Sequence, residues 1–140
     1  MRRTLEQERA ADALTKVTDL EQKAAGNSKQ VDINDRYAQE AKGLPATIIM
    51  NGLGQAMATL RAGKDEHNGI LYRHCQEWLC RNDAKAAPYP GQRDLLAALT
   101  AGSREDYLRA QNEALAWLNW LKKFATAYLP KPDKQGGGSQ

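Results

Sequence analysis

The sequence has few of the residues that a β-sheet requires. Of its 140 residues only six are valine or isoleucine (2 and 4), whereas 38 are alanine or leucine (22 and 16). β-branched residues favour strands, while alanine and leucine favour helices. No stretch shows the alternation of a strand, and no segment is repeated. We therefore expect an all-α protein, a compact bundle of about six helices with no sheet.

The sequence also lacks a long apolar run. Nowhere does it reach the roughly 18 consecutive apolar residues of a membrane-spanning helix, and the charged start Met1-Arg2-Arg3 has no signal-peptide core. Its two cysteines, Cys75 and Cys80, project about 140° apart on a helix, which excludes a disulfide between them. These absences predict a cytoplasmic protein in a reducing compartment, with no membrane contact.

Recognisable catalytic motifs are absent as well. There is no nucleophile elbow and no phosphate-binding loop, and Gly52-Leu53-Gly54 is too short for a dinucleotide fingerprint. His67, His74, Cys75 and Cys80 lack the spacing of metal ligands, so we interpret them as surface histidines beside partly buried thiols. The sequence predicts no enzyme, no cofactor and no metal site.

Helical periodicity and stop signals divide the chain into six predicted helices. Thr4 and Gln7 form a capping box before the first helix, and Ser103 caps the last and longest one. The predicted helices run from 5 to the stop at Gly26, from 32 or 34 to 43, from 45 to 62, from 65 to 81, from 93 to 100 and from 104 to 129. Residues 1–129 should form a single helical domain, and residues 130–140 a flexible C-terminal tail.

Two glycines interrupt the predicted third helix. Gly52 and Gly54 lie inside an apolar stretch that begins at Pro45, and each costs about 1 kcal/mol relative to alanine in a helix. Either the helix ends in a turn there, or a neighbouring group comes too close to leave room for a side chain. That neighbour could be another helix, another subunit or RNA, and the sequence leaves all three open.

Basic residues recur every seven positions along the first helix: Arg2, Arg9, Lys16 and Lys23. Such a row could follow a phosphate backbone. However, Asp12 and Asp19 interleave with it at spacings of three and four, the pattern of a salt-bridged solvated face. We favour the solvated face, because acids repel phosphate as much as bases attract it.

A second basic set flanks the glycines with fewer acids nearby: Lys42, Arg61, Lys64 and Arg73. The net charge of +3, from 20 basic and 17 acidic residues, permits binding to nucleic acid without requiring it. This set could bind an RNA backbone without reading its sequence, or it could be ordinary surface. The sequence favours neither of these two interpretations.

The last helix is apolar over a wide arc. Trp117, Trp120 and Phe124 form one stripe beside another of alanine, leucine and tyrosine. Such a helix is either central to its own domain, which we favour, or shared with a partner through aromatic anchors.

Two segments resemble the signatures of a known family. Leu44–Ala58, with its Leu-Pro and Asn-Gly-Leu-Gly-Gln elements, and Glu113–Ala125, with its Trp-Leu-Lys-Lys-Phe-Ala end, are similar to the small all-helical subunit of type III-B CRISPR effector (Cmr) complexes. The opening Leu5–Ala10 is similar too, so the likeness extends to about Leu129.

The resemblance implies a non-catalytic subunit that stacks with copies of itself into a minor filament. Its other partners would be the backbone and large subunits, the CRISPR RNA and the target RNA, which it would help to hold. Under this interpretation the second basic set faces RNA, with Arg9 and Lys16 as weaker candidates. Asn51, Gln55, Trp117 and Trp120 would lie at subunit interfaces.

Two other functions remain open. A helical DNA-binding regulator would need a recognition helix with several exposed polar side chains, and the stretch after Pro45 is too apolar for that. A pure protein adaptor would bind through the aromatic stripe alone. Substitution of Trp117 or Trp120 would separate interface from core, because loss of assembly by a folded monomer indicates an interface.

Overall fold

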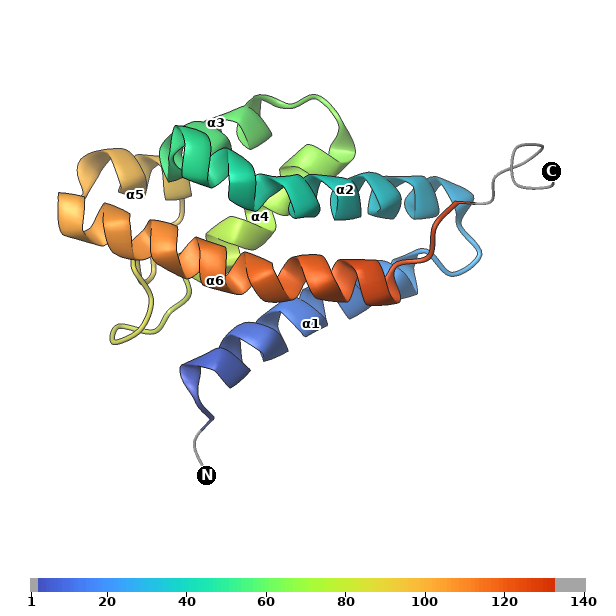
Figure 1. The fold of residues 1–140 in the computed structure, drawn as a ribbon, viewed down its shortest axis with the longest axis horizontal. Coiled ribbons are helices and arrows are strands. Elements are labelled where there is room, and N and C mark those ends of the chain that lie inside the picture. Colours follow the sequence, from blue (N-terminus) through green and yellow to red (C-terminus); the bar gives the residue numbers. More distant parts are fainter. Residues whose placement is uncertain (1–2, 133–140) are drawn as a thin grey trace.

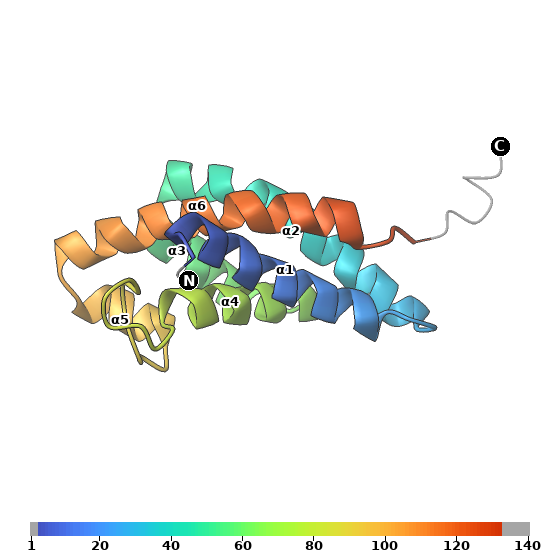
Figure 2. The same ribbon diagram turned by 90° about the horizontal axis from the view of Figure 1, so that it is seen from below.

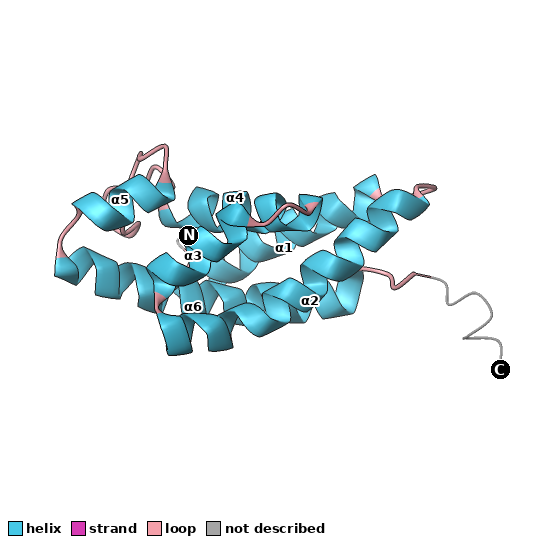
Figure 3. Ribbon diagram, turned by 90° about the horizontal axis from the view of Figure 1, so that it is seen from above, coloured by secondary structure: helices cyan, strands magenta, loops and turns pink. Residues whose placement is uncertain are grey.

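The chain folds as a bundle of helices. The computed structural model describes residues 3–132, and in that range helices and loops account for the whole structure (Figure 3). The six helices are α1 (Leu5–Lys23), α2 (Ser28–Asn51), α3 (Leu53–Ala62), α4 (Glu66–Leu79), α5 (Leu95–Ala101) and α6 (Arg104–Tyr128). The all-α prediction is confirmed. None of these helices is both long enough and apolar enough to cross a membrane.

The longest helix, α6, lies at the centre of the bundle. It runs side by side with α2 along the long axis of the molecule, while α1 crosses it on another side (Figures 1 and 2). α4 packs against α2 and α3, and the short α5 packs against α3. The chain then leads directly from α5 into α6 (Figure 1). The inner face of α6 is buried at Ala114, Leu118, Leu121 and Ala125. As favoured from the sequence, α6 is a core helix.

The first and last helices begin at the predicted caps. The hydroxyl oxygen of Thr4 accepts a hydrogen bond from the Gln7 amide at 3.0 Å, and the Gln7 side chain accepts one from the Thr4 amide at 2.8 Å. Ser103 likewise accepts from the Asp106 amide at 3.1 Å. Each contact satisfies an N–H group that the helix itself leaves without a partner.

The predicted boundary at Gly43 and Pro45 is wrong. α2 begins earlier, at Ser28, and continues through both residues to Asn51. Pro45 has no N–H, so one intrahelical hydrogen bond is missing at this point. The helix persists because a single stripe of buried side chains crosses the proline at helical spacing: Asn34, Tyr37, Ala41, Leu44 and Ile48. Their burial outweighs the local preference of proline for a helix start.

The chain instead turns at Gly52, between α2 and α3. Gly52 has φ +89° and ψ 157°, a conformation essentially restricted to glycine. A Cβ atom there would lie 3.2 Å from the hydroxyl oxygen of Tyr107 on α6, and one on Gly54 would lie 3.3 Å from the same atom. Both interpretations of the glycines therefore hold, a turn and a close approach, and the neighbour is a helix of the same chain.

α6 also caps the start of α3. Because Gly52 carries no side chain to cap the helix, two polar groups of α6 do so. The Gly54 amide donates to the Tyr107 hydroxyl at 2.8 Å, and the Leu53 amide donates to the Gln111 side-chain oxygen at 2.9 Å. The α2–α3 elbow, residues 49–55, is thereby fixed to α6.

The loop between α4 and α5 is anchored to the core. Its Ala87 and Tyr89 side chains are buried, and the Tyr89 amide donates to the Leu79 carbonyl at 3.1 Å. Residues 133–140, most of the tail that the sequence predicts to be flexible, lie outside the described residues.

Replacing Gly52 by alanine should destabilise the fold. The backbone conformation at this position costs a side chain about 1–3 kcal/mol. Gly43→Ala is the matched control, because Gly43 is helical and nothing lies within 4 Å of its Cβ position. That substitution should stabilise the protein by about 0.5–1 kcal/mol. Urea unfolding measures both changes, and equal free energies of unfolding for the two variants would contradict the role of Gly52.

Candidate functional site

One buried carboxylate joins three helices. The Glu113 side chain of α6 accepts hydrogen bonds from Nε and Nη2 of Arg9 on α1, at 2.7 and 2.9 Å, and from the indole of Trp78 on α4, at 3.0 Å. Glu113 is only 8% exposed. Its hydrogen bond with Arg9 raises the pKa of the Arg9 guanidinium above the usual value of this group. A bidentate pair in this geometry fixes orientation as well as charge.

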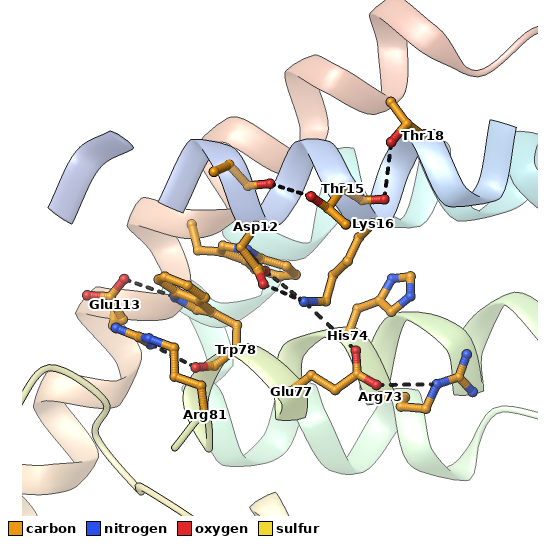
Figure 4. A network of polar contacts seen from close by, with 12 residues as sticks. Asp12, Thr15, Lys16, Thr18, Arg73, His74, Glu77, Trp78, Arg81 and Glu113 are labelled. Atoms are coloured by element: carbon orange, nitrogen blue, oxygen red, sulfur yellow. Dashed lines mark hydrogen bonds and ion pairs between the residues drawn. The ribbon is translucent and has the colours of Figure 1, made fainter. Parts of the chain in front are cut away.

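A second polar contact lies one turn further along α1. The Asp12 carboxylate accepts from the Trp117 indole at 2.8 Å and from the Lys16 ammonium at 2.7 Å. The same ammonium lies 3.8 Å from a Glu77 oxygen on α4 and 5.8 Å from the Trp117 ring centroid. Figure 4 shows Asp12 and Lys16 of α1 and Glu77 of α4 pointing toward one another.

Arg9 and Lys16 therefore point into the bundle. Their side chains are 19% and 11% exposed, so for these two residues neither the solvated face nor the phosphate-binding row is correct. Lys23 does form an exposed pair with Asp19, at 3.3 Å, while Arg2 lies outside the described residues. The acids at i+3 and i+4 were visible in the sequence, but the distant partner Glu113 was missed. The sequence did contain a signal for this pair, because Glu113 is an acidic residue within the apolar face of the last helix.

Trp117 is part of the core. It is fully buried, so its assignment to a subunit interface is wrong. The reason is that its indole N–H is held by Asp12 inside the domain. Trp120 is partly buried and stacks on Phe124, with ring centroids 5.7 Å apart.

The histidines and cysteines serve as buried structural groups. Contrary to the prediction of surface histidines, His67 and His74 are both buried. Burial and the nearby Lys16 charge lower the pKa of His74 to about 3. Burial raises the pKa of the Cys75 thiol to about 12 and that of Cys80 to about 11, so neither is an activated nucleophile. Among residues 3–132, no three His, Cys, Asp or Glu side chains are grouped so that they could hold a metal ion.

The four cations of the second basic set are exposed but lie in different surroundings. The Arg61 guanidinium lies 5.3 Å from the ring centroid of Tyr72, and Arg73 lies 3.9 Å from Glu77. Lys64 forms no ion pair among the described residues. Lys42 faces α6, where it lines a hollow together with Lys122, Lys123 and Thr126. The sequence analysis did not select Lys122 and Lys123 as candidate site residues, although two adjacent lysines on one helix are a recognisable signal.

The elbow exposes apolar side chains. Ile49 and Met50 are 70% and 81% exposed, and the predicted interface residues Asn51 and Gln55 are exposed beside them in sequence. The apolar pair was missed because it belongs to an apolar run that looked like core.

These features define a class of protein. It is a small helical bundle whose buried ionisable groups tie its own helices together. The model of the family described as CRISPR-associated protein (Cas_Cmr5) matches residues 5–128, and the chain belongs to this family.

A solved structure supports the same assignment. The crystal structure of a CRISPR-associated Cmr5 family protein from Thermus thermophilus is similar to this one, with a TM-score of 0.69 and 26% sequence identity. The match covers 92% of this chain and 100% of that chain. The resemblance drawn from the sequence motifs is confirmed, and the protein is a subunit of a CRISPR Cmr complex.

Removing the Glu113 carboxylate should destabilise the fold strongly. Glu113→Ala leaves the Trp78 indole without its acceptor and Arg9 with Glu6 as its remaining partner. Loss of one partner of a buried ion pair costs about 3 kcal/mol or more. Asn112→Ala, at the exposed neighbouring position on α6, should change the free energy of unfolding by less than about 0.5 kcal/mol. Thermal or urea unfolding compares them, and similar losses for both would show that the carboxylate has no special role.

Stability should fall on acidification because of His74. The folded state keeps His74 neutral, whereas the unfolded chain binds a proton below about pH 6.5, so stability declines as the pH drops from 6.5 toward 3. Between pH 7 and 5 the loss should be about 2 kcal/mol. The groups around the ring are Lys16, Asp19 and Lys23 of α1, Tyr37 of α2 and Arg73 of α4.

The variant His74→Gln isolates this contribution. It cannot take up the proton, so its free energy of unfolding should depend less on pH over the same range. Parallel pH profiles for the two proteins would exclude His74 as the cause.

Proposed function

We propose that this chain is a non-catalytic minor-filament subunit of a cytoplasmic type III-B CRISPR complex. It scaffolds the assembly by contacting the backbone and large subunits and other copies of itself, and it helps to hold target RNA beside the CRISPR RNA. Membership of the Cas_Cmr5 family supports the assignment to such a complex.

One observation carries the non-catalytic scaffold role. The reactive side chains of the interior are committed to contacts between helices: Glu113 to Arg9, Asp12 to Trp117 and His74 to Tyr37. The exposed side chains include an apolar pair at the elbow and cations on the helix surfaces. Such a surface is suited to binding large partners rather than to chemistry.

The elbow is suited to a protein subunit. Met is enriched at the centres of protein interfaces, and large apolar side chains act there as anchors. Ile49 and Met50 are presented on a backbone that Tyr107 and Gln111 of α6 hold in place, so little conformational entropy is lost on binding. Asn51 and Gln55 supply polar contacts at the rim.

Cationic side chains supply the contact with RNA. Base pairing with the guide reads the sequence of the target, so the protein needs only to bind its backbone. Lys42, Arg61, Lys64 and Arg73 remain the predicted RNA-facing residues. Arg9 and Lys16 are no longer proposed, because their side chains are partly buried and held in ion pairs within the bundle.

Recovery of the tagged chain from its native host tests the proposal as a whole. The other subunits of the complex should co-purify, and sequencing of the bound RNA should return CRISPR-derived RNA. Recovery of the chain alone, or with unrelated RNA, would reject the proposal and favour an adaptor or regulator outside CRISPR defence.

Substitutions at the elbow should impair assembly without unfolding the protein. Ile49→Ser combined with Met50→Ser removes exposed apolar groups, so the free energy of unfolding should change by no more than about 1 kcal/mol. Binding to the rest of the complex should weaken about tenfold or more, as for truncated interface anchors. Tyr128→Ser, at another exposed apolar position on α6, is the control. Size-exclusion chromatography with the remaining subunits gives the bound fraction, and equal fractions for the two variants would mean that the elbow is not an interface.

A further inference from the structure

A hollow between α2 and α6 gathers three lysines. Lys42 of α2 and Lys122 and Lys123 of α6 line it together with Thr126, and its volume is about 440 Å³. α2 and α6 run side by side at this point (Figure 1). These four residues are called the lysine groove below.

Within the described part of the chain, nothing compensates the charge of the lysine groove. Among residues 3–132, no carboxylate lies within ion-pair distance of any of its three ammonium groups, and none lines the groove. Two other hollows of the molecule each contain a carboxylate, Asp106 in one and Glu113 in the other. Like charges held together repel one another, and a bound anion relieves that repulsion.

The hydrogen-bonding groups of the groove favour recognition without sequence preference. The Thr126 hydroxyl already donates to the Lys122 carbonyl, at 3.0 Å, so the ammonium groups are the main free donors. Ammonium groups on flexible stems act as point charges, in contrast to the rigid fork of arginine. They suit phosphates along a backbone better than the edges of bases.

A nucleic acid suits the groove better than an acidic protein surface does. Lysine is depleted at protein interfaces, where aromatic and Met side chains are enriched. The described residues that line this groove are three lysines and a threonine. Interfaces with nucleic acid are more polar and more positively charged than interfaces between proteins. The exposed apolar pair that suits a protein lies elsewhere, at the elbow.

We infer that the lysine groove binds phosphates of single-stranded RNA and is the main RNA contact of this subunit. This inference rests on the proposed function, in which the RNA is the target strand of the assembled complex. It narrows the broader basic set to one main site. Arg61 lies over the Tyr72 ring and Arg73 lies near Glu77, whereas no acid among residues 3–132 lines the groove around Lys42.

Two matched double variants test the site in the assembled complex. Lys122→Gln with Lys123→Gln removes two charges from the groove, and the control Lys29→Gln with Lys85→Gln removes two charges from exposed positions outside it. Each phosphate contact to a single strand contributes about 0.7 to the slope of log affinity against log salt. The groove variant removes two such contacts, so the magnitude of this slope should decrease by about 1.4 for each copy that contacts RNA. Its affinity for target RNA at about 0.1 M salt should fall about tenfold or more, while the control should change by less than about twofold.

The single variant Lys42→Gln tests whether both helices take part, since it should lower the slope by about 0.7 per contacting copy. Circular dichroism and recovery of the complex verify folding and assembly for every variant. Equal losses for the groove pair and the control pair would overturn the inference, because they would show a general effect of net charge.

The remaining outcomes separate the inference from the proposed function. A groove variant that folds but no longer joins the complex would show that an acidic protein surface occupies the groove, which also overturns the inference. A complex lacking this subunit that binds target RNA as well as the complete one would reject the RNA-holding role itself. A third double variant, Arg61→Gln with Lys64→Gln, tests the competing site. Loss of RNA binding in this variant but not in the groove variant would keep that role but overturn the groove as its site.

Discussion

The buried carboxylate of Glu113 is the constraint on which the bundle depends. It lies on the central helix α6 and takes hydrogen bonds from Arg9 of α1 and Trp78 of α4. An ionised carboxylate away from water is costly unless its oxygens are satisfied, so this contact admits few alternative arrangements of α1 and α4. Asp12 repeats the same arrangement one turn along α1, with Trp117 and Lys16 as donors. Together these contacts fix the position of α1 against α6.

α6 also determines what the surface can offer. Near its beginning, Tyr107 and Gln111 hold the elbow and so present Ile49 and Met50 to solvent. Near its end, Lys122 and Lys123 meet Lys42 across the groove. The interior face between them is committed to packing. A single helix therefore supports the core, the proposed protein contact and the proposed RNA contact, which explains why its apolar arc is so wide and yet interrupted by charge.

The features that could be predicted from sequence are those that depend on neighbours along the chain. The helix caps, the absence of strands among residues 3–132 and the core character of α6 follow from local spacing, and the family resemblance follows from short motifs. The boundary at Pro45 could not be predicted correctly, because the buried stripe from Asn34 to Ile48 outweighs a missing hydrogen bond. Arg9 and Lys16 were misplaced for a related reason: acids nearby in sequence suggested a solvated row, while Glu113 lies 104 residues away from Arg9.

The sequence by itself determined the helical class, the family and the need for glycine between α2 and α3. Tertiary structure alone decided which neighbour that glycine faces, that Trp117 is core rather than interface, and that Lys42 joins Lys122 and Lys123 instead of Arg61 and Arg73. The physical reason is that helix formation and capping act over three or four residues. Burial and the sharing of charge between helices depend on how the helices pack, and packing brings together residues that are remote in the chain.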